Sequence, residues 1–434
     1  NTRSRGLGDV YKRQIMNKNL FFSILIFLPL VTLSQKRTLL IGGTAYVGNG
    51  DKIENSVICI EGEKIDFVAN SSEIKIDPTA FDTIIRLHGK FIYPSFILPN
   101  SRLGITEIDA VRATHDFREV GSFNPHVRTK IAYNTDSKII GTLRANGILV
   151  SQVAPIGGLF SGQSSVFYLD GNNWENALCK SDDGIHLNWP RSYNKSGWWA
   201  EPGESKRNKE YQQKVLKIED YLDEASSYFN NNGEKIDIKM ESMKGLFDGS
   251  KNLYVHADYY TEIIDAIDLL KKKKVKKIVS VGGEEVLMAK NIIKNNNINV
   301  ILNRVHRLPS KVGSSIYEPY TQAKLLHENE ILFCFSYEGD MEVMGSRNLP
   351  FTAGTSVAYG LDYNIAIKSL TLNAAKILGI DNRLGSLEAG KEATFFISDG
   401  DALDIMSNNL FLAYIRGKTI KLTNHQTELY EKFK

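Results

Sequence analysis

The feature of this sequence that most constrains its fold is an alternation of apolar runs and amphipathic stretches, from Phe91 to about residue 379. Apolar runs that end in glycine or polar residues are typical of buried parallel strands. The stretches between them, such as Tyr260–Lys273, repeat isoleucine and leucine at helical spacing. This pattern predicts an α/β fold with a TIM (β/α)8 barrel, and one strand is expected between Gly171 and Asp248. The other predicted strands are Ile92–Leu98, Ile148–Val153, Ser165–Leu169, Leu253–His256, Lys277–Val281, Val300–Val305 and Ile331–Ser336.

Short strands are also predicted at both ends of the chain. Residues 38–93 contain apolar runs separated by glycine turns, and further strands are expected at Ala393–Ser398 and Phe411–Ile415. We expect residues 36–93 and 380–434 to pair into one small sheet domain that flanks a barrel of residues 94–379.

An insertion is expected in the barrel at about residues 171–248. It contains all four tryptophans and a predicted long helix, Glu204–Tyr228. Long insertions after barrel strands often cover a site, so Trp198 and Trp199 are candidate substrate contacts. A peripheral insertion with tryptophans in its own small core is the competing interpretation.

The amino terminus predicts export. Residues 1–15 resemble a translated sequencing-adapter artefact, so Met16 is the predicted start. A charged start and the apolar run Leu20–Val31 are typical of a secretory signal peptide, here residues 16–34. The run is shorter than the roughly 20 residues that a membrane-spanning helix needs, although an uncleaved anchor is the alternative. We expect a periplasmic or extracellular protein that is free of the membrane after signal removal.

Charge and cysteine content narrow the class of partner. The formal net charge is +3, but residues 1–15 hold four basic residues and one acidic residue, so the rest is nearly neutral. This balance argues against a nucleic-acid or membrane-surface partner. The three cysteines form neither a disulfide framework nor a C-x-x-C metal site. A small-molecule or short-peptide substrate is expected, and homo- and hetero-oligomers both stay open.

Two groups of motifs resemble the amidohydrolase superfamily, in the form of its imidazolonepropionase-like and prolidase-like branch. One group comprises Thr371–Gly379, Gly385–Ala393 and Asp399–Asp401, and the other Ile60–Ile65 and Gly89–Pro94. The resemblance covers about residues 38–434. It implies a TIM barrel flanked by a small β-sandwich, and hydrolysis of C–N bonds assisted by a divalent metal, zinc or similar.

The metal site that this resemblance implies is degenerate. The superfamily takes two histidines from strand one, one each from strands five and six, and an acid from strand eight as general base. Here Asn100 and Arg102 stand at the strand-one positions, and Gly282 or Gly283 at the strand-six position. Asn is a poor zinc ligand, and the fixed charge of Arg opposes a bound cation.

Three residues remain for the chemistry. His256 ends strand five and is the candidate metal ligand, with a hydrogen-bonded barrel histidine as the competing interpretation. Glu338 and Asp340 follow strand eight and are the candidate catalytic acids.

The candidate substrate-binding residues are Asn100, Arg102 and His306, which follows strand seven, while His186 is assigned to the insertion. Two functions stay open. The first is an exported hydrolase that directs a metal-assisted water at a non-peptide or cyclic amide bond. The second is a catalytically inactive binding protein or partner subunit, which Arg102 favours because its charge can replace that of the metal.

Overall fold

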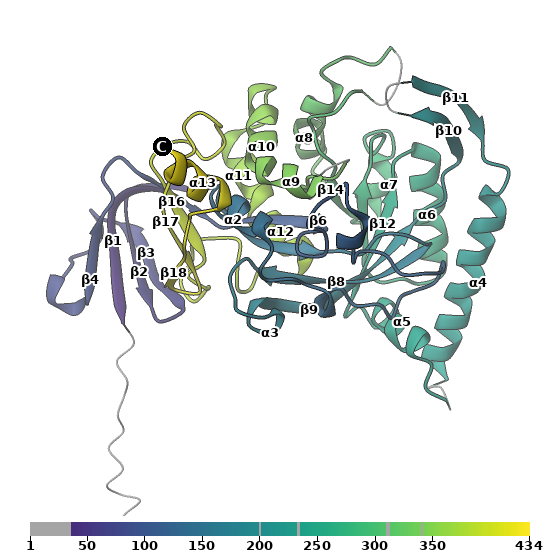
Figure 1. Ribbon diagram of the computed structural model, residues 1–434, viewed down its shortest axis with the longest axis horizontal. Helices are drawn as coiled ribbons and strands as arrows, with labels where there is room; N and C mark the ends of the chain where they lie inside the picture. Colours follow the sequence, from purple (N-terminus) through teal and green to yellow (C-terminus); the bar gives the residue numbers. More distant parts are fainter. Residues whose placement is uncertain (1–35, 199–200, 232–234, 310–312, 340–341) are drawn as a thin grey trace, which may run out of the picture. The chain divides into compact units, whose positions relative to one another are not determined.

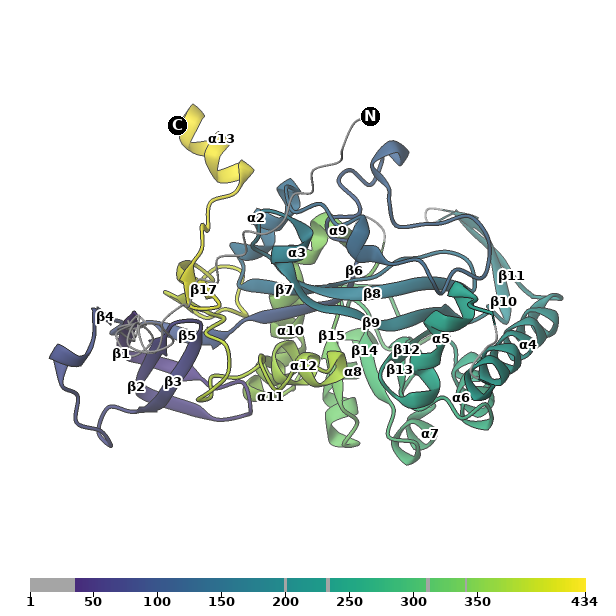
Figure 2. The same cartoon turned by 90° about the horizontal axis from the view of Figure 1, so that it is seen from below.

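An eight-stranded sheet and the helices packed against it form the main apolar core of the molecule (Figures 1 and 2). The computed structural model describes residues 36–198, 201–231, 235–309, 313–339 and 342–434, so the predicted signal peptide of residues 16–34 lies outside the described residues. The sheet follows chain order and is nearly closed. Between its two end strands, Ser336 Oγ donates a hydrogen bond of 3.0 Å to Pro99 O. Its strands are β6 (Phe96–Ser101), β7 (Ile148–Val153), β8 (Phe160–Tyr168), β9 (Leu178–Asn188), β12 (Asn252–Ala257), β13 (Ile278–Gly282), β14 (Asn299–Leu302) and β15 (Phe333–Phe335).

The first half of this barrel departs from the all-parallel sheet that the sequence predicts. Strand β8 runs antiparallel to both β7 and β9, whereas the other neighbouring pairs are parallel. The reason is the length of the connections. Only residues 154–159 join β7 to β8, and residues 169–177, with the short helix α3 (Trp174–Ala177), join β8 to β9. A parallel crossover needs a dozen or more residues, so these connections can only reverse the chain.

The second half alternates strands and helices as predicted. Helix α6 (Tyr260–Lys272) follows β12 and buries Ile263, Ile267 and Leu270, which lie at helical spacing. Thr371 separates the last two helices of this half. The other helices of this half are α7 (Lys290–Asn295), α8 (Glu318–Glu328), α9 (Glu342–Gly345), α10 (Leu349–Ala358), α11 (Tyr363–Leu370) and α12 (Leu372–Leu378).

The region of the expected insertion contains the missing barrel strand, β9. Beyond β9 lie the hairpin strands β10 (Tyr193–Trp198) and β11 (Glu201–Arg207), then the helices α4 (Tyr211–Asn230) and α5 (Ile238–Asp248). The predicted helix Glu204–Tyr228 therefore begins too early, because residues 201–207 pair with β10. Helix α4 lies beside α6, where Lys273 forms ion pairs with Glu219 and Asp223 (Figures 1 and 2). Trp199 and the side chain of Trp198 lie outside the described part of the chain.

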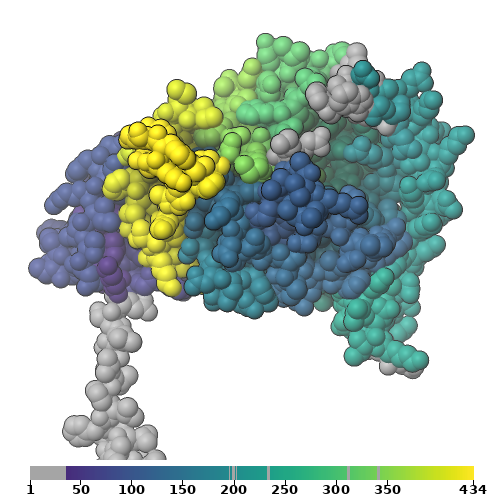
Figure 3. Space-filling model, viewed as in Figure 1, coloured from purple at the N-terminus to yellow at the C-terminus, as the bar shows by residue number. Residues whose placement is uncertain are grey.

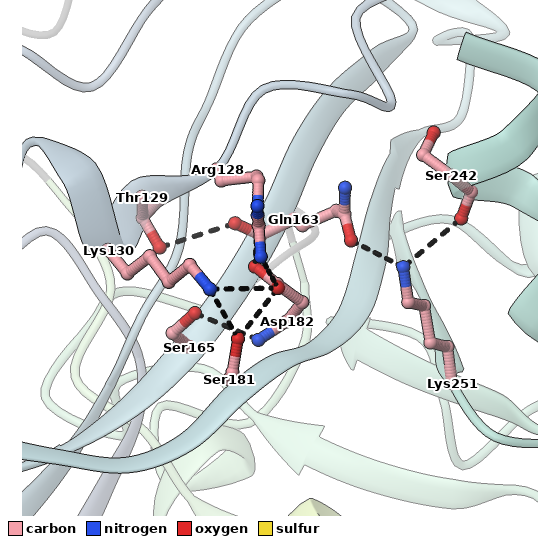
Figure 4. A network of polar contacts seen from close by, with 9 residues as sticks. All are labelled: Arg128, Thr129, Lys130, Gln163, Ser165, Ser181, Asp182, Ser242 and Lys251. Carbon is pink, nitrogen blue, oxygen red and sulfur yellow. Dashed lines mark hydrogen bonds and ion pairs between the residues drawn. The ribbon is translucent and has the colours of Figure 1, made fainter. Parts of the chain in front are cut away.

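A polar network fixes the segment before α2 (Lys138–Arg144) onto strands β8 and β9 (Figure 4). Asp182 on β9 accepts hydrogen bonds from both Arg128 and Lys130, the latter at 3.2 Å from Lys130 Nζ. Lys130 Nζ also donates to Ser181 Oγ at 2.7 Å. Burial raises the pKa of Asp182, but the hydrogen bonds from Arg128 and Ser181 outweigh it and hold the pKa at about 2.

Strands from both chain ends pair in a second sheet, as the sequence predicts. Antiparallel pairing of β16 with β5 joins the two ends, and Figure 3 shows the carboxyl-terminal residues (yellow) beside the amino-terminal strands (purple). Buried apolar side chains line both faces of this sheet. Its strands are β1 (Arg37–Tyr46), β2 (Lys52–Glu61), β3 (Lys64–Asn70), β4 (Thr83–Arg86), β5 (Phe91–Pro94), β16 (Phe395–Ser398), β17 (Leu410–Ile415) and β18 (Lys418–Thr419), followed by helix α13 (His425–Phe433). The helices of the described residues include none whose length and apolar character would allow it to cross a membrane.

Candidate active site

A pocket of about 180 Å³ lies at the carboxyl ends of the barrel strands. This is the end at which TIM barrels carry their sites. Larger depressions exist elsewhere on the surface, but this one gathers acids, a histidine, an arginine and amides from five successive strand ends. The residues that line it are Asn188, Trp189, Arg191, His256, Ala257, Asp258, Glu262, Val281, Gly282, Asn303 and Glu338.

Asn100 and Glu338 lie together at this end of the barrel. The β6–β7 register shifts between Leu98 and Ser101, and Asn100 takes a left-handed backbone conformation with φ 51°. Asn tolerates this conformation better than most residues. Asn100 is buried, and its Nδ2 donates a hydrogen bond of 2.9 Å to Glu338 Oε2. The strand-one position that usually ligates a metal therefore binds the strand-eight acid directly.

Glu338 has the pKa of a proton carrier. Burial, with a further contribution from the nearby Asp258, raises the pKa of Glu338 to about 7 against the opposing effects of Arg102 and the Asn100 hydrogen bond. The pKa of Asp258 is also raised, mainly by burial, although Arg191 opposes the shift. A carboxyl group with a pKa near 7 can both take and give a proton at neutral pH.

Gly282 at the sixth strand gives Asp258 its space. A Cβ atom at Gly282 would lie 2.6 Å from Asp258 Oδ1, which is closer than Cβ atoms approach other atoms in proteins. The backbone of Gly282 also has φ 96°, which a histidine would adopt only with strain. On the other side, Asn303 Nδ2 lies 3.5 Å from Asp258 Oδ1. The residue at the strand-six position thus admits a carboxylate where a histidine ligand is expected.

His256 is paired with His186, which corrects the assignment of His186 to the insertion. His186 lies on barrel strand β9 and is fully buried, and its Nδ1 is 2.9 Å from His256 Nε2. Burial lowers the pKa of His256 to about 4, and burial together with His256 lowers the pKa of His186. Both rings are therefore neutral at pH 7, one donating to the other. The sequence did not reveal this pair because it predicts a barrel strand between Gly171 and Asp248 without placing that strand at Leu178–Asn188.

A buried network behind Asn100 contains residues that the sequence did not single out. Asn100 N–H donates to Gln152 Oε1 at 2.9 Å, and Gln152 Nε2 donates to Asp183 Oδ2 at 2.8 Å. Asp183 also accepts from Tyr254 Oη at 2.6 Å and from Ser164 Oγ at 2.8 Å. Because Asp183 takes the amide nitrogen of Gln152, the Gln152 oxygen must face Asn100. The network thereby fixes the backbone that carries the Asn100 side chain.

Three other residues that the sequence predicts for the site are Arg102, His306 and Asp340. The Arg102 guanidinium stands 4.9 Å from the centre of the Phe117 ring, and its charge lowers the pKa of Glu338. His306 does not line the pocket, because its exposed ring faces Thr355, with Nε2 2.7 Å from Thr355 Oγ1. Asp340 lies outside the described residues.

The described residues do not fit the divalent metal that the resemblance implies. Among them, no three His, Cys, Asp or Glu side chains are grouped to hold a metal ion. His256 Nε2 is engaged by His186, and the Asn100 amide directs its nitrogen, a hydrogen-bond donor, toward Glu338. A bound cation would also face the charge of Arg102, which acts on the same carboxylate.

Comparisons with known proteins agree with this architecture. The amidohydrolase family model matches residues 218–424. "Amidohydrolase tasK" of Hapsidospora irregularis is 33% identical over 69 residues, which are 16% of this chain and 7% of that protein. The chain therefore spans only a small part of that relative.

Two solved structures share the fold. The crystal structure of an amidohydrolase from Thermotoga maritima MSB8 is similar with a TM-score of 0.75 and 21% identity, over 88% of this chain and 99% of that one. A Xaa-Pro dipeptidase with bound methionine in its active site gives a TM-score of 0.56 and 14% identity, over 89% of this chain and 100% of that one. Residues 218–424 of this chain therefore match the amidohydrolase family, and both solved structures share its barrel fold.

Proposed function

We propose that this protein hydrolyses a C–N bond in a small molecule or short peptide, with Glu338 and Asp258 exchanging the protons. The match of residues 218–424 to the amidohydrolase family supports the reaction class. The observation that carries the proposal is the pair of carboxyl groups with raised pKa values in one pocket. Two interacting acids, one ionised and one protonated, can serve as base and acid in the same turnover.

The side chains divide the reaction as follows. The Glu338 carboxylate takes a proton from water as the water oxygen forms a bond with the carbonyl carbon. The C–N bond breaks when a carboxyl group of the pair returns a proton to the leaving nitrogen, giving a carboxylic acid and an amine. Asn100 holds Glu338 in place, at 2.9 Å between Nδ2 and Oε2. No step uses a divalent metal, because the described donor set does not fit one.

Substrate binding is assigned to the other side chains of the pocket. Arg191 is exposed and supplies a positive charge, whereas the buried Trp189 supplies apolar surface. Trp189 is held in place by Tyr211, whose Oη lies 3.1 Å from Nε1. Together they favour a compact substrate that combines an apolar part with an anionic or polar group.

A substrate panel with matched variants tests this proposal. N-acyl amino acids, cyclic amides and dipeptides would be incubated with the protein, and release of amine and acid measured by mass spectrometry. Glu338→Gln should lower kcat by about 10²- to 10⁴-fold, the usual contribution of a general acid–base group. Glu224→Gln, which changes an exposed acid of α4, should leave it unchanged. Turnover that is equal in wild type and Glu338→Gln would refute the role of Glu338.

We further propose export, on the strength of residues 16–34 alone. The pattern of a charged start and an apolar run supports this localisation. Expression from Met16 in a Gram-negative host, followed by cell fractionation, should place a shortened chain in the periplasm. A full-length chain that stays in the cytoplasm would contradict the proposal.

A further inference from the structure

The opposite end of the barrel carries a pocket of about 250 Å³ that the catalytic proposal does not use. It lies where β12, β13 and β14 begin, whereas the candidate active site lies where they end. Residues far apart in the sequence converge there. Its basic side chains are Lys180 on β9, Lys271 in the last turn of α6, Lys276 and Lys277 before β13, and Lys376 in the last turn of α12.

These lysines have few internal partners. Among the described residues none of the five forms an ion pair, whereas the neighbouring Lys272 and Lys273 of the same run pair with Glu219. Lys180 Nζ donates to the carbonyl oxygens of Leu378 and Gly379, at 2.7 and 3.3 Å. Lys271, Lys276, Lys277 and Lys376 are exposed. The excess charge is local, because the chain beyond residue 15 is nearly neutral.

Helix ends do not account for so much positive charge. Three helix carboxyl termini, those of α6, α7 and α12, line the pocket and together contribute roughly 1.5 negative charges. The acid that lines it, Asp183, is fully buried and accepts hydrogen bonds from Tyr254, Ser164 and Gln152. Within the pocket, five ammonium groups therefore face these helix ends and one carboxyl that is turned into the barrel. Beyond the lining, Lys277 also interacts with Asp248, and Lys376 with Glu388. Asn296, Asn297 and Asn299 add amides to the rim.

We propose that this pocket binds a compact polyanion that carries two or more phosphate groups. Lysine binds phosphate as a point charge, and several lysines around one concavity select for several charges on one ligand. The volume suits a diphosphate or a phosphorylated headgroup, being somewhat below the 300–1,000 Å³ or so of drug-sized sites. The site is separate from the proposed C–N hydrolysis, and binding there does not require catalysis.

Calorimetric titration with sodium pyrophosphate tests the site directly. At low salt the wild-type protein should bind one pyrophosphate per chain, with an affinity that falls steeply as salt is raised. Lys276→Glu/Lys277→Glu should weaken binding at least about tenfold, since it replaces two attractive charges by two repulsive ones. The control Lys209→Glu/Lys217→Glu makes the same charge change at exposed lysines of the α4 region and should bind as wild type.

A second experiment distinguishes a lipid headgroup from a free phosphorylated ligand. Sedimentation with vesicles of phosphatidylcholine containing phosphatidic acid measures binding to a phosphorylated lipid surface. Vesicle binding lost in Lys276→Glu/Lys277→Glu would identify a headgroup ligand, whereas pyrophosphate binding without vesicle binding would identify a free one. Absence of saturable pyrophosphate binding, or equal binding by the pocket variant and the control, would overturn the proposal. Circular dichroism confirms that each variant is folded.

Discussion

The two halves of the barrel differ in how far they keep the regular plan. From β12 to β15 strands and helices alternate, and the whole of this half lies inside the family match at residues 218–424. From β6 to β9 the sheet contains the antiparallel strand β8, and this half lies outside the match. The regular half supplies the acids Asp258 and Glu338. The irregular half supplies Asn100, which binds Glu338, and Gln152, which binds the backbone of Asn100. It also supplies the buried His186, which contacts His256.

This difference shows how a site can be rebuilt without replacing its framework. The irregular half places Asn100, Gln152 and Asp183 in one hydrogen-bonded series that ends on Glu338. It also engages His256 through His186. Asn100 and His256, at positions where the family resemblance implies metal ligands, instead contact Glu338 and His186.

The largest expected effect comes from the irregular half. Asp183→Ala should lower the free energy of unfolding by about 4 kcal/mol, because it leaves the buried donors of Tyr254, Ser164 and Gln152 without an acceptor. Urea denaturation measures the loss. Asp170→Ala, at a surface ion pair with Arg144, should cost under about 1 kcal/mol. Equal losses in the two variants would show that the network does not stabilise the barrel.

The regular half should show an unusual pH dependence. The pKa of Glu338 rises from 4.5 to about 7 on folding, so the folded chain holds this proton where the unfolded chain has lost it. Stability from this group is therefore greatest below pH 4.5 and falls by about 3 kcal/mol as the pH rises to 7.

His256 acts in the opposite sense, since its pKa of about 4 costs stability as the pH falls below 6.5. The effect of Glu338 must therefore be taken as a difference. The stability of Glu338→Gln minus that of wild type should rise between pH 4.5 and pH 7, measured by denaturation at each pH. A difference that does not change with pH would show that Glu338 titrates normally.

A smaller effect is expected at Asp182, on the outside of the irregular half. Its pKa is held at about 2 against a usual 3.8, so it contributes about 2 kcal/mol above pH 4 that is lost as the pH falls toward 2. Asp182→Ala should lower the free energy of unfolding by this amount at pH 7. Its melting temperature should also fall less steeply than that of the wild type as the pH is lowered from 4 to 2. An unchanged melting temperature at pH 7 would mean that the ion pairs with Arg128 and Lys130 contribute nothing.

The smallest effect is expected at His306, in the regular half. Its exposed side chain contacts Thr355 and lies away from the pocket. His306→Ala should change the unfolding free energy by under about 0.5 kcal/mol, and should change neither kcat nor KM once a substrate is known. A large rise in KM would return His306 to the substrate-binding set.

The sequence predicts the regular half well because its signals are local. The apolar face of α6 and the runs that become β12 to β14 can be found by periodicity within ten or so residues. The orientation of β8 depends on where the neighbouring strands begin and end, and the predicted strand at Ser165–Leu169 omitted its first five residues. Strand β9 lies in a tryptophan-rich region, and its charged residues Asp182 and Asp183 depend largely on partners far along the chain, such as Lys130 and Tyr254.

The sequence identified several residues of the site but not the contacts between them. The sequence singled out Asn100, His256 and Glu338, but their partners come from residues far along the chain. Glu338 lies 238 positions from Asn100, and His186 lies 70 positions from His256. Such pairings depend on the strand order of the closed sheet. Asp258 could have been noticed, because it follows His256 by two residues at the same strand end.

The most direct test of the account is the ionisation of Glu338 itself. Carbon-13 labelling of glutamate side chains, with Glu338→Gln to assign the signal, allows the carboxyl resonance to be followed from pH 4 to pH 9. The account predicts a midpoint of about 7, and a higher midpoint in Asn100→Ala, because the Asn100 hydrogen bond lowers the pKa. A midpoint near 4.5 that Asn100→Ala leaves unchanged would contradict it.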